Sequence, residues 1–208
     1  MKNVLLIGDS IRIGYDKSVK KTLEGLANVY FPSDNCRFAN YVLRYLHEYG
    51  ALIKEGEVDV IHWNAGLWDC IHLFGEVTTP IEIYAYYIDR VCRHIQKLFP
   101  NAKVIFATST SVQTEKMSPN FIRYNEEIEK YNEVAVEIVL KYGFEVNDLY
   151  TLSVSLPPEA HSDAVHYYTP IGTEKFTDQV VSYLAPALGL DTVPTYSEVL
   201  HTDKPIGF

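Results

Sequence analysis

Positive charge is scarce in this sequence. Its 208 residues include 18 Lys and Arg against 27 Asp and Glu, which gives a formal net charge of −9. Nucleic acids and anionic membrane surfaces are bound by basic faces, so this balance argues against both as main partners. We therefore expect neither a nucleic-acid partner nor a membrane partner.

Long hydrophobic runs and cysteines are also few. No stretch approaches the ~20 apolar residues of a membrane-spanning helix, and the first apolar run, NVLLI at 3–7, is too short for the core of a signal peptide. A leader removed upstream of residue 1 would leave no trace here. Cys36, Cys70 and Cys92 are an odd number without metal-like spacing. We interpret them as reduced thiols and predict a cytoplasmic protein.

Repeats, low-complexity segments and linkers are absent as well, so the chain length indicates one domain. Apolar residues make up 47% of the sequence and charged residues 22%, the balance of a soluble globular protein. We expect residues 1–190 to form this domain. Residues 191–208 contain two prolines and little periodicity, which predicts a C-terminal extended tail.

Short apolar runs alternate with longer amphipathic segments along the chain. Strands are predicted at 3–7, 28–31, 58–63, 103–109 and 144–146, and helices at 37–49, 81–99, 120–142 and 170 to about 184. Thr169 is the expected N-cap of the last helix, with Pro170 in its first position. The alternation predicts an α/β fold with a parallel sheet of about five strands and helices on both faces.

In such sheets, ligands bind beyond the carboxyl ends of the strands. The first strand runs directly into Gly8-Asp9-Ser10, which places a hydroxyl at this end. A serine hydroxyl is a poor nucleophile until a base accepts its proton. Gly8 would allow a close approach of the backbone, and Asp9 would brace the turn. The alternative is that Ser10 only caps a helix.

A possible base lies just before the last predicted helix, in HSDAVHYY at 161–168. Asp163 and His166 are three residues apart, so the carboxylate could hold the Nδ1–H of the imidazole and leave Nε2 as a proton acceptor. Two alternatives stay open. The segment could be a polar loop, or His161, Asp163 and His166 could bind a metal, although no further His or Cys cluster supports that interpretation.

A third polar element, IHWNAGLWD at 61–69, follows another predicted strand. The Asn64 amide, the Gly66 backbone N–H and the Trp68 indole N–H are candidate donors to an oxyanion. The alternative is that the tryptophan packs at the rim and the asparagine supports a turn.

Taken together, Gly8-Asp9-Ser10, the element at Gly66 to Asp69 and Asp163-x-x-His166 resemble, in order and spacing, the SGNH (GDSL-type) hydrolase family over residues 3–186. The resemblance implies a three-layer α/β/α sandwich of flavodoxin-like topology. It also implies esterase or acylhydrolase activity on a small-molecule ester, without metal or cofactor. Ser10 would be the nucleophile, His166 the base and Asp163 the residue that orients it.

The chain departs from the family pattern at two places in the oxyanion hole. The second block of the family supplies a glycine N–H, but PSDNCRF at 32–38 has no glycine, so the backbone of Asn35 or Cys36 would have to serve beside that of Ser10. In the third block, Trp68 stands where the family has an asparagine. Either Asn64 or the Trp68 indole takes over, or the hole is weaker.

The substrate is less well defined by the sequence. Arg12 and Arg37 follow crevice segments and could bind an acidic group or simply lie on the solvated surface. Tyr167 beside the base could form part of an aromatic wall for a sugar, or pack in the rim or core. An aromatic wall would favour a deacetylase of O-acetylated carbohydrate. One rival is a weak or inactive carbohydrate-binding relative. The other is a phosphate- or nucleotide-binding module. Such a module needs a loop rich in Gly, Ser or Thr after the first strand, which this sequence lacks, and Asp9 would repel phosphate. The oligomeric state stays open.

Overall fold

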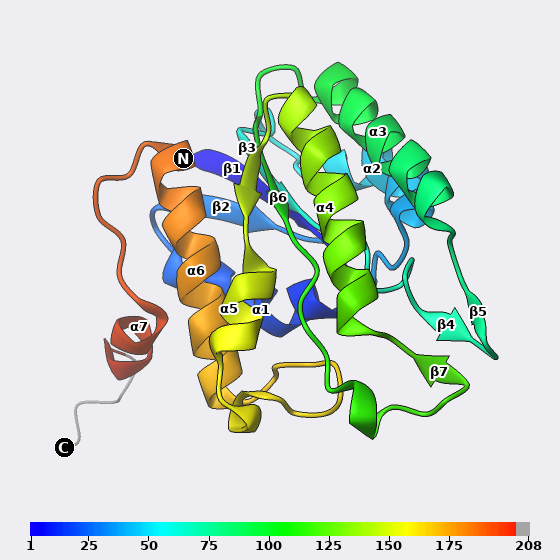
Figure 1. Ribbon diagram of the computed structural model, residues 1–208. Helices are drawn as coiled ribbons and strands as arrows, with labels where there is room; N and C mark the ends of the chain where they lie inside the picture. The colour runs from blue at the N-terminus through cyan, green and yellow to red at the C-terminus, as the bar shows by residue number, and fades with distance from the viewer. Residues whose placement is uncertain (203–208) are drawn as a thin grey trace.

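The computed structural model describes residues 1–202 and is built around a five-stranded parallel sheet (Figure 1). Its strands lie in the order β2 (Ala27–Tyr30), β1 (Lys2–Ile7), β3 (Val60–Trp63), β6 (Lys103–Ala107) and β8 (Glu145–Asn147). Every neighbouring pair is parallel. This is the flavodoxin-like strand order. The predicted α/β fold and its sheet of about five strands are confirmed.

Helices cover both faces of the sheet. The pair α1 (Ser10–Thr22) and α6 (Pro170–Leu188) packs on one face, and α2 (Ala39–Gly50), α3 (Ile81–Leu98) and α4 (Asn125–Lys141) pack on the other (Figure 1). Central strands are therefore covered twice, which is why β1 and β3 are almost continuously apolar and buried. The resulting α/β/α sandwich has three layers, as the family resemblance implies.

The last helix of the domain begins where the sequence predicts. Thr169 is its N-cap, and its hydroxyl accepts a hydrogen bond of 3.2 Å from the backbone N–H of Gly172. Pro170 takes the first helical position, where no N–H is needed. The helix continues to Leu188, beyond the predicted end near residue 184, and stops at Gly189 in the left-handed conformation.

A small second sheet lies near the carboxyl ends of the central strands and was not predicted (Figure 1). It is antiparallel, with the order β5 (Glu76–Val77), β4 (His72–Leu73) and β7 (Phe121–Ile122). Strand β7 occupies residues that were expected to belong to α4, so that helix begins five residues later. Strands of two residues have no room for an alternating pattern, which explains why sequence periodicity does not reveal them.

The remaining elements are short. Helix α5 (Leu149–Ser155) and the 3₁₀ turns at Thr114–Lys116 and Pro158–Ala160 connect the larger ones. The C-terminal segment, expected to be extended, contains helix α7 (Tyr196–Thr202), which contacts α1 and α6. Residues 203–208 of that expected tail lie outside the described residues. Over residues 1–202, no helix combines the length and the apolar character needed to cross a membrane.

Candidate active site

Ser10 is held at the junction of β1 and α1. The helix is capped by Asp9, whose Oδ1 accepts a 2.9 Å hydrogen bond from the N–H of Ile11. Ser10 is thus the first helical residue, and its own N–H is one of the donors that a helix N-terminus leaves unpaired. The alternative that Ser10 caps the helix is wrong, because Asp9 does so. At Gly8 a Cβ would lie 1.9 Å from Asn64 Oδ1, so only glycine fits there.

The loop before α6 forms a turn around the Asp163 carboxylate. Its Oδ1 accepts hydrogen bonds from the N–H groups of Val165 (2.8 Å) and His166 (2.9 Å), while Oδ2 lies 2.8 Å from His166 Nδ1. On the far side of the ring, His166 Nε2 lies 2.8 Å from Ser10 Oγ. The structure therefore brings together three side chains that span 156 residues of sequence, with the distances of a Ser-His-Asp triad.

The environment of Asp163 favours its ionised form. Partial burial raises the pKa of this carboxyl, but the two backbone N–H donors and the His166 ring outweigh that effect, and the pKa lies below its usual value. An ionised Asp163 can hold the Nδ1–H tautomer of His166, which leaves Nε2 free to accept the proton of Ser10. The carboxylate is 54% exposed and the imidazole 26% exposed, so the pair lies at the surface.

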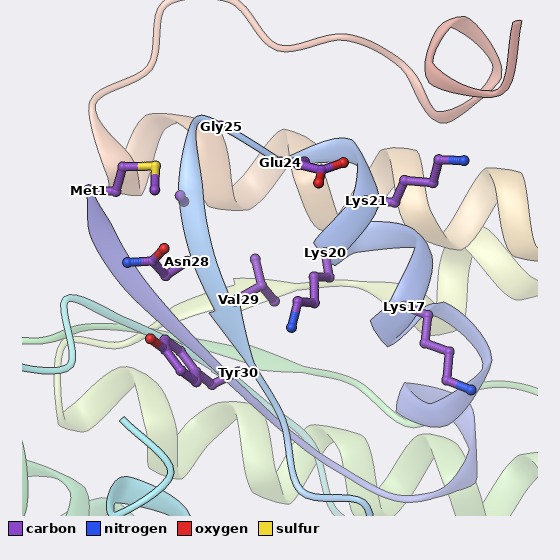
Figure 2. Close-up of a pocket in the computed structure, with 10 residues that line it drawn as sticks. Met1, Lys17, Lys20, Lys21, Glu24, Gly25, Asn28, Val29 and Tyr30 are labelled. Carbon is purple, nitrogen blue, oxygen red and sulfur yellow. The ribbon is translucent and has the colours of Figure 1, made fainter. Parts of the chain in front are cut away.

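One large pocket of the described chain does not contain this triad. It has a volume of about 680 Å³ and lies between α1 and the edge strand β2, lined by Lys17, Lys20 and Tyr30 among others (Figure 2). None of its lining residues is Ser10, Asp163 or His166. The triad instead sits on an open part of the surface, as the exposure of Asp163 also indicates.

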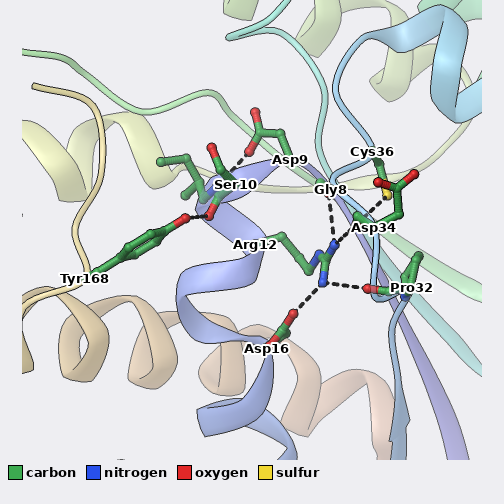
Figure 3. Close-up of polar contacts among 10 residues, drawn as sticks. Gly8, Asp9, Ser10, Arg12, Asp16, Pro32, Asp34, Cys36 and Tyr168 are labelled. Carbon is green, nitrogen blue, oxygen red and sulfur yellow. Dashed lines mark hydrogen bonds and ion pairs between the residues drawn. The ribbon is translucent and has the colours of Figure 1, made fainter. Parts of the chain in front are cut away.

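The two tyrosines that follow His166 point in different directions: Tyr168 contacts the triad, whereas Tyr167 is buried in the core. Tyr168 donates a 2.5 Å hydrogen bond to the Ser10 carbonyl (Figure 3). Its ring also stacks on that of His166, with 4.7 Å between the centroids. Tyr168 flanks the candidate base in the sequence but was not among the predicted site residues, for which Tyr167 was chosen. Tyr167 was predicted to contact substrate, but it is 3% exposed and donates to the Ser111 carbonyl at 3.0 Å. That prediction is wrong, because Tyr167 points into the core.

Arg12 was predicted to bind an acidic substrate group, and the structure contradicts this. The side chain is 1% exposed, and both terminal nitrogens of its guanidinium are engaged inside the protein (Figure 3), while Nε has no hydrogen-bond partner in the described chain. It pairs with Asp16 and donates to three backbone carbonyls, those of Pro32 (3.0 Å), Asp34 (2.5 Å) and Gly8 (3.4 Å). Arg37, the second candidate, is exposed and lies 5.6 Å from the Tyr41 ring, so its contact with substrate stays a prediction.

The loop after β2 offers one of the two oxyanion donors proposed from the sequence. The N–H of Cys36 already donates to the Gly8 carbonyl at 3.1 Å, so the prediction that it serves an oxyanion is wrong. The side chain of Asn35 accepts a 3.0 Å hydrogen bond from the N–H of Arg37. Within residues 1–202 the N–H of Asn35 itself has no hydrogen-bond partner. Of the two predicted donors, Asn35 is therefore the one that stays a candidate.

In the segment after β3, Asn64 has a supporting position. It is buried, with its Oδ1 against Gly8 and its amide next to Asp9. Burial raises the pKa of Asp9, and the N–H of Ile11 and the Asn64 amide oppose this rise. The prediction that Asn64 donates to an oxyanion is therefore wrong, because its side chain braces the turn before Ser10 from inside.

Gly66 and Trp68 lie further along this segment. Gly66 has a φ of +156°, and a Cβ there would come within 2.3 Å of Ser109 Oγ. Trp68 is half-buried and makes edge contacts with Phe38 (5.8 Å) and Phe121 (6.5 Å). Across the described chain, no hydrogen bond engages its indole N–H. Both residues stay predicted donors.

Two buried charged residues hold the same segment in place. Asp69 Oδ2 accepts a 3.0 Å hydrogen bond from the N–H of Ala39, which joins the segment to the start of α2. Burial raises the pKa of Asp69 to about 7. Arg123, just after β7, donates from Nε to the Leu67 carbonyl at 2.5 Å. Neither role was found from the sequence, because nothing local marks Asp69 or Arg123 as buried.

The alternative metal site is not formed. Over residues 1–202, no three His, Cys, Asp or Glu side chains are arranged to hold a metal ion. His161 instead lies against the Tyr167 ring, with 4.0 Å between ring centroids. The three cysteines are unpaired and buried.

No protein-family model and no curated protein sequence matches the chain. Among solved structures, a lipase/acylhydrolase from Enterococcus faecalis superimposes with a TM-score of 0.69 at 19% identity, over 89% of this chain and 96% of that one. A GDSL-like lipase from Bacteroides thetaiotaomicron gives 0.70 at 14%, over 89% of each chain. An acetyl xylan esterase from Geobacillus stearothermophilus gives 0.65 at 15%, over 93% and 97%. The chain thus has the fold of the SGNH, or GDSL-type, hydrolases.

Proposed function

We propose that the protein is a serine esterase that cleaves small acyl esters through Ser10, His166 and Asp163. The observation that carries the proposal is the unbroken chain of contacts from Ser10 Oγ to His166 Nε2 and from His166 Nδ1 to Asp163, each 2.8 Å long. It occurs on a fold shared with lipases, acylhydrolases and acetyl xylan esterases. No metal or cofactor takes part in the proposed mechanism.

In the acylation half-reaction, Ser10 Oγ attacks the ester carbonyl while His166 Nε2 accepts its proton. Asp163 stabilises the imidazolium that forms. The negative oxygen of the tetrahedral intermediate is stabilised by backbone N–H donors, for which Ser10 and Asn35 are available. His166 then gives the proton to the leaving alcohol as the ester C–O bond breaks, and the acyl group remains on Ser10.

In the deacylation half-reaction, His166 takes a proton from water as the water oxygen attacks the acyl-Ser10 carbonyl. Collapse of the second tetrahedral intermediate breaks the bond to Ser10 Oγ. His166 returns the proton to the serine, and a carboxylic acid leaves. The same residue thus serves as base and acid in each half-reaction.

We further propose an acetyl group as the acyl group and a carbohydrate as its carrier. Acetyl xylan esterases are among the structural relatives, which supports this choice. The triad also lies on an open surface, where a bulky alcohol could reach it. Buried, unpaired thiols favour a reducing compartment such as the cytoplasm. The alternative, a weak or inactive carbohydrate-binding relative, is favoured by Trp68 at the position where the family has an asparagine.

The test is hydrolysis of p-nitrophenyl acetate, butyrate and octanoate, with acetate release from acetylated xylan measured alongside. We expect turnover of the acetate ester and a loss of about 10⁴–10⁶-fold in Ser10→Ala. Ser182→Ala, a serine on α6 whose hydroxyl donates to the Gln179 carbonyl, is the matched control and should keep full activity. Equal rates in wild type and Ser10→Ala would contradict the proposal. No turnover of any ester would favour the inactive relative.

A further inference from the structure

The loop after β2 lacks the glycine whose N–H the hydrolase family uses, yet it is tightly fixed. Arg12 donates to the carbonyls of Pro32 and Asp34, and the N–H of Cys36 donates to the Gly8 carbonyl. Asn35 lies between two of these attachment points. Its N–H, like those of Ser33 and Asp34, has no hydrogen-bond partner within the described chain. The N–H groups of Ser33 and Asn35 each share a peptide with a carbonyl that Arg12 holds, but of the two only Asn35 is next to the residue bound to Gly8.

The orientation of that N–H follows from peptide geometry. The Asp34 carbonyl and the Asn35 N–H belong to one planar trans peptide, so they point in opposite directions. The Asp34 carbonyl accepts from the buried Arg12 guanidinium at 2.5 Å (Figure 3). The Asn35 N–H must therefore point away from the guanidinium. A charge-assisted hydrogen bond to the carbonyl also polarises the peptide and makes its N–H a stronger donor.

Arg12 ties this peptide to the nucleophile. It lies in the first turn of α1, two residues after Ser10, and also donates to the Gly8 carbonyl at 3.4 Å. Its ion pair with Asp16 on the next turn anchors the guanidinium to α1. The positions of both N–H groups therefore depend on the first turn of α1: Ser10 is part of that turn, and the peptide of Asn35 is bound by Arg12 from it. A guanidinium holds its donors in a rigid planar fork, whereas the three donors of a lysine ammonium form a compact group on a flexible stem, so lysine would not fix these carbonyls in the same geometry.

We propose that Arg12 is a positioning residue that aims the backbone N–H of Asn35 as the second donor of the oxyanion hole, in place of the missing glycine. This inference rests on the proposed esterase function. It replaces the sequence-based idea that Arg12 binds an acidic group of the substrate, since the guanidinium is enclosed by the protein's own carbonyls and by Asp16.

The experiment measures kcat and KM for p-nitrophenyl acetate, expressed per active site counted with diethyl p-nitrophenyl phosphate. Asn35→Ala keeps the N–H and loses only the side chain, whereas Asn35→Pro loses the N–H as well. Between these two variants we expect kcat to fall about 10²–10³-fold. KM should change little, because the interaction is made in the transition state.

Arg12→Lys should lower kcat about 10–10²-fold, again with little change in KM. Its effect should disappear in the Asn35→Pro background, because the donor that Arg12 aims is then absent. Arg44→Lys on α2, an exposed arginine paired with Glu48, is the matched control and should leave kcat unchanged. A merely structural role of Arg12 would lower thermal stability but would not show this dependence on residue 35.

Three results overturn the inference: an unchanged kcat in Arg12→Lys, an equal kcat in Asn35→Ala and Asn35→Pro, or an Arg12→Lys effect that persists in full in the Asn35→Pro background. If circular dichroism shows that Arg12→Lys does not fold, Asp16→Asn, which loosens the anchor of the guanidinium, takes its place with the same criteria. Failure of the esterase function is distinguishable, because wild type and Ser10→Ala would then give equal rates.

Discussion

Two segments flank the turn that carries Ser10, and they are held in different ways. Residues 32–36, after β2, contain no glycine and are fixed from inside by the donors of Arg12. Residues 64–69, after β3, depend on Gly66 in a conformation that favours glycine and on a buried acid, Asp69. The first segment is therefore held by the long side chain of Arg12, whereas the second requires a glycine, which has no side chain, at position 66. Both arrangements can fix the position of backbone N–H donors.

Gly8 is where the two segments meet, and changing it should have the largest effect. Its carbonyl accepts from Cys36 and Arg12, while its Cα faces Asn64, so Gly8→Ala would disturb both sides at once. We expect kcat/KM to fall at least about 10²-fold and the free energy of unfolding, from urea denaturation, to fall by about 1–3 kcal/mol.

A second substitution distinguishes the clash between a Cβ at position 8 and Asn64 from a general loss of fold. Asn64→Ala removes the atom that lies 1.9 Å from the new Cβ, so Gly8→Ala/Asn64→Ala should be more stable than Gly8→Ala alone. Equal stability of Gly8→Ala and wild type would show that this turn tolerates a side chain, and would contradict the role of Gly8 as the close contact between the two segments.

Gly66→Ala tests the segment after β3 alone. The substitution combines an unfavourable φ with a Cβ placed 2.3 Å from Ser109 Oγ, and we expect about 1–3 kcal/mol of destabilisation and a clear loss of kcat. Gly25→Ala is the matched control, because Gly25 has a φ of +77° and open space around it. It should cost stability and leave kcat unchanged. A Gly66→Ala enzyme with wild-type kcat would mean that this glycine does not shape the site.

Asp69→Asn should reduce the pH dependence of stability that the buried carboxyl in the segment after β3 produces. Burial raises the pKa of Asp69 to about 7, so between pH 4 and pH 7 the folded protein keeps a proton that the unfolded chain has lost. The stability associated with this proton is fully present below about pH 4 and is lost as the pH rises through about 7. Urea denaturation from pH 4 to 9 should show this decline in wild type and a smaller one in Asp69→Asn. An identical decline would contradict the assignment.

Trp68→Phe should have the smallest effect. Phenylalanine keeps an aromatic ring between Phe38 and Phe121 but has no indole N–H. With the backbone donors of Ser10 and Asn35 still in place, we expect kcat to fall by less than about 10-fold. A loss of about 10²-fold or more would instead make the indole a principal oxyanion donor, as an asparagine is in the related family.

The fold could be predicted largely from the sequence because its elements are long and regular. The apolar run at 3–7 forms a central strand, and helix α6 begins at Pro170 with Thr169 as its N-cap. The antiparallel sheet of two-residue strands and helix α7 had no such pattern. Short elements are determined by tertiary contacts, which local periodicity does not encode.

The candidate site was predictable only where spacing along the chain determines geometry. Asp163 and His166 form one turn, so three residues of separation were enough to suggest their contact. Burial was the part that the sequence did not reveal. Arg12 looked like a surface cation and Tyr167 like a substrate contact, yet both point inward, and Tyr168 one residue later contacts Ser10. Which side chain faces the crevice depends on how distant loops meet.

The most direct measurement of the central claim is peptide mass spectrometry of the protein after brief reaction with p-nitrophenyl acetate and an acid quench. If Ser10 is the nucleophile, an acetyl group should appear on the peptide that contains Ser10 in the wild type and be absent in Ser10→Ala. His166→Ala should acquire it far more slowly. Acetylation confined to surface lysines, with equal p-nitrophenol release by wild type and Ser10→Ala, would contradict a serine mechanism at this site.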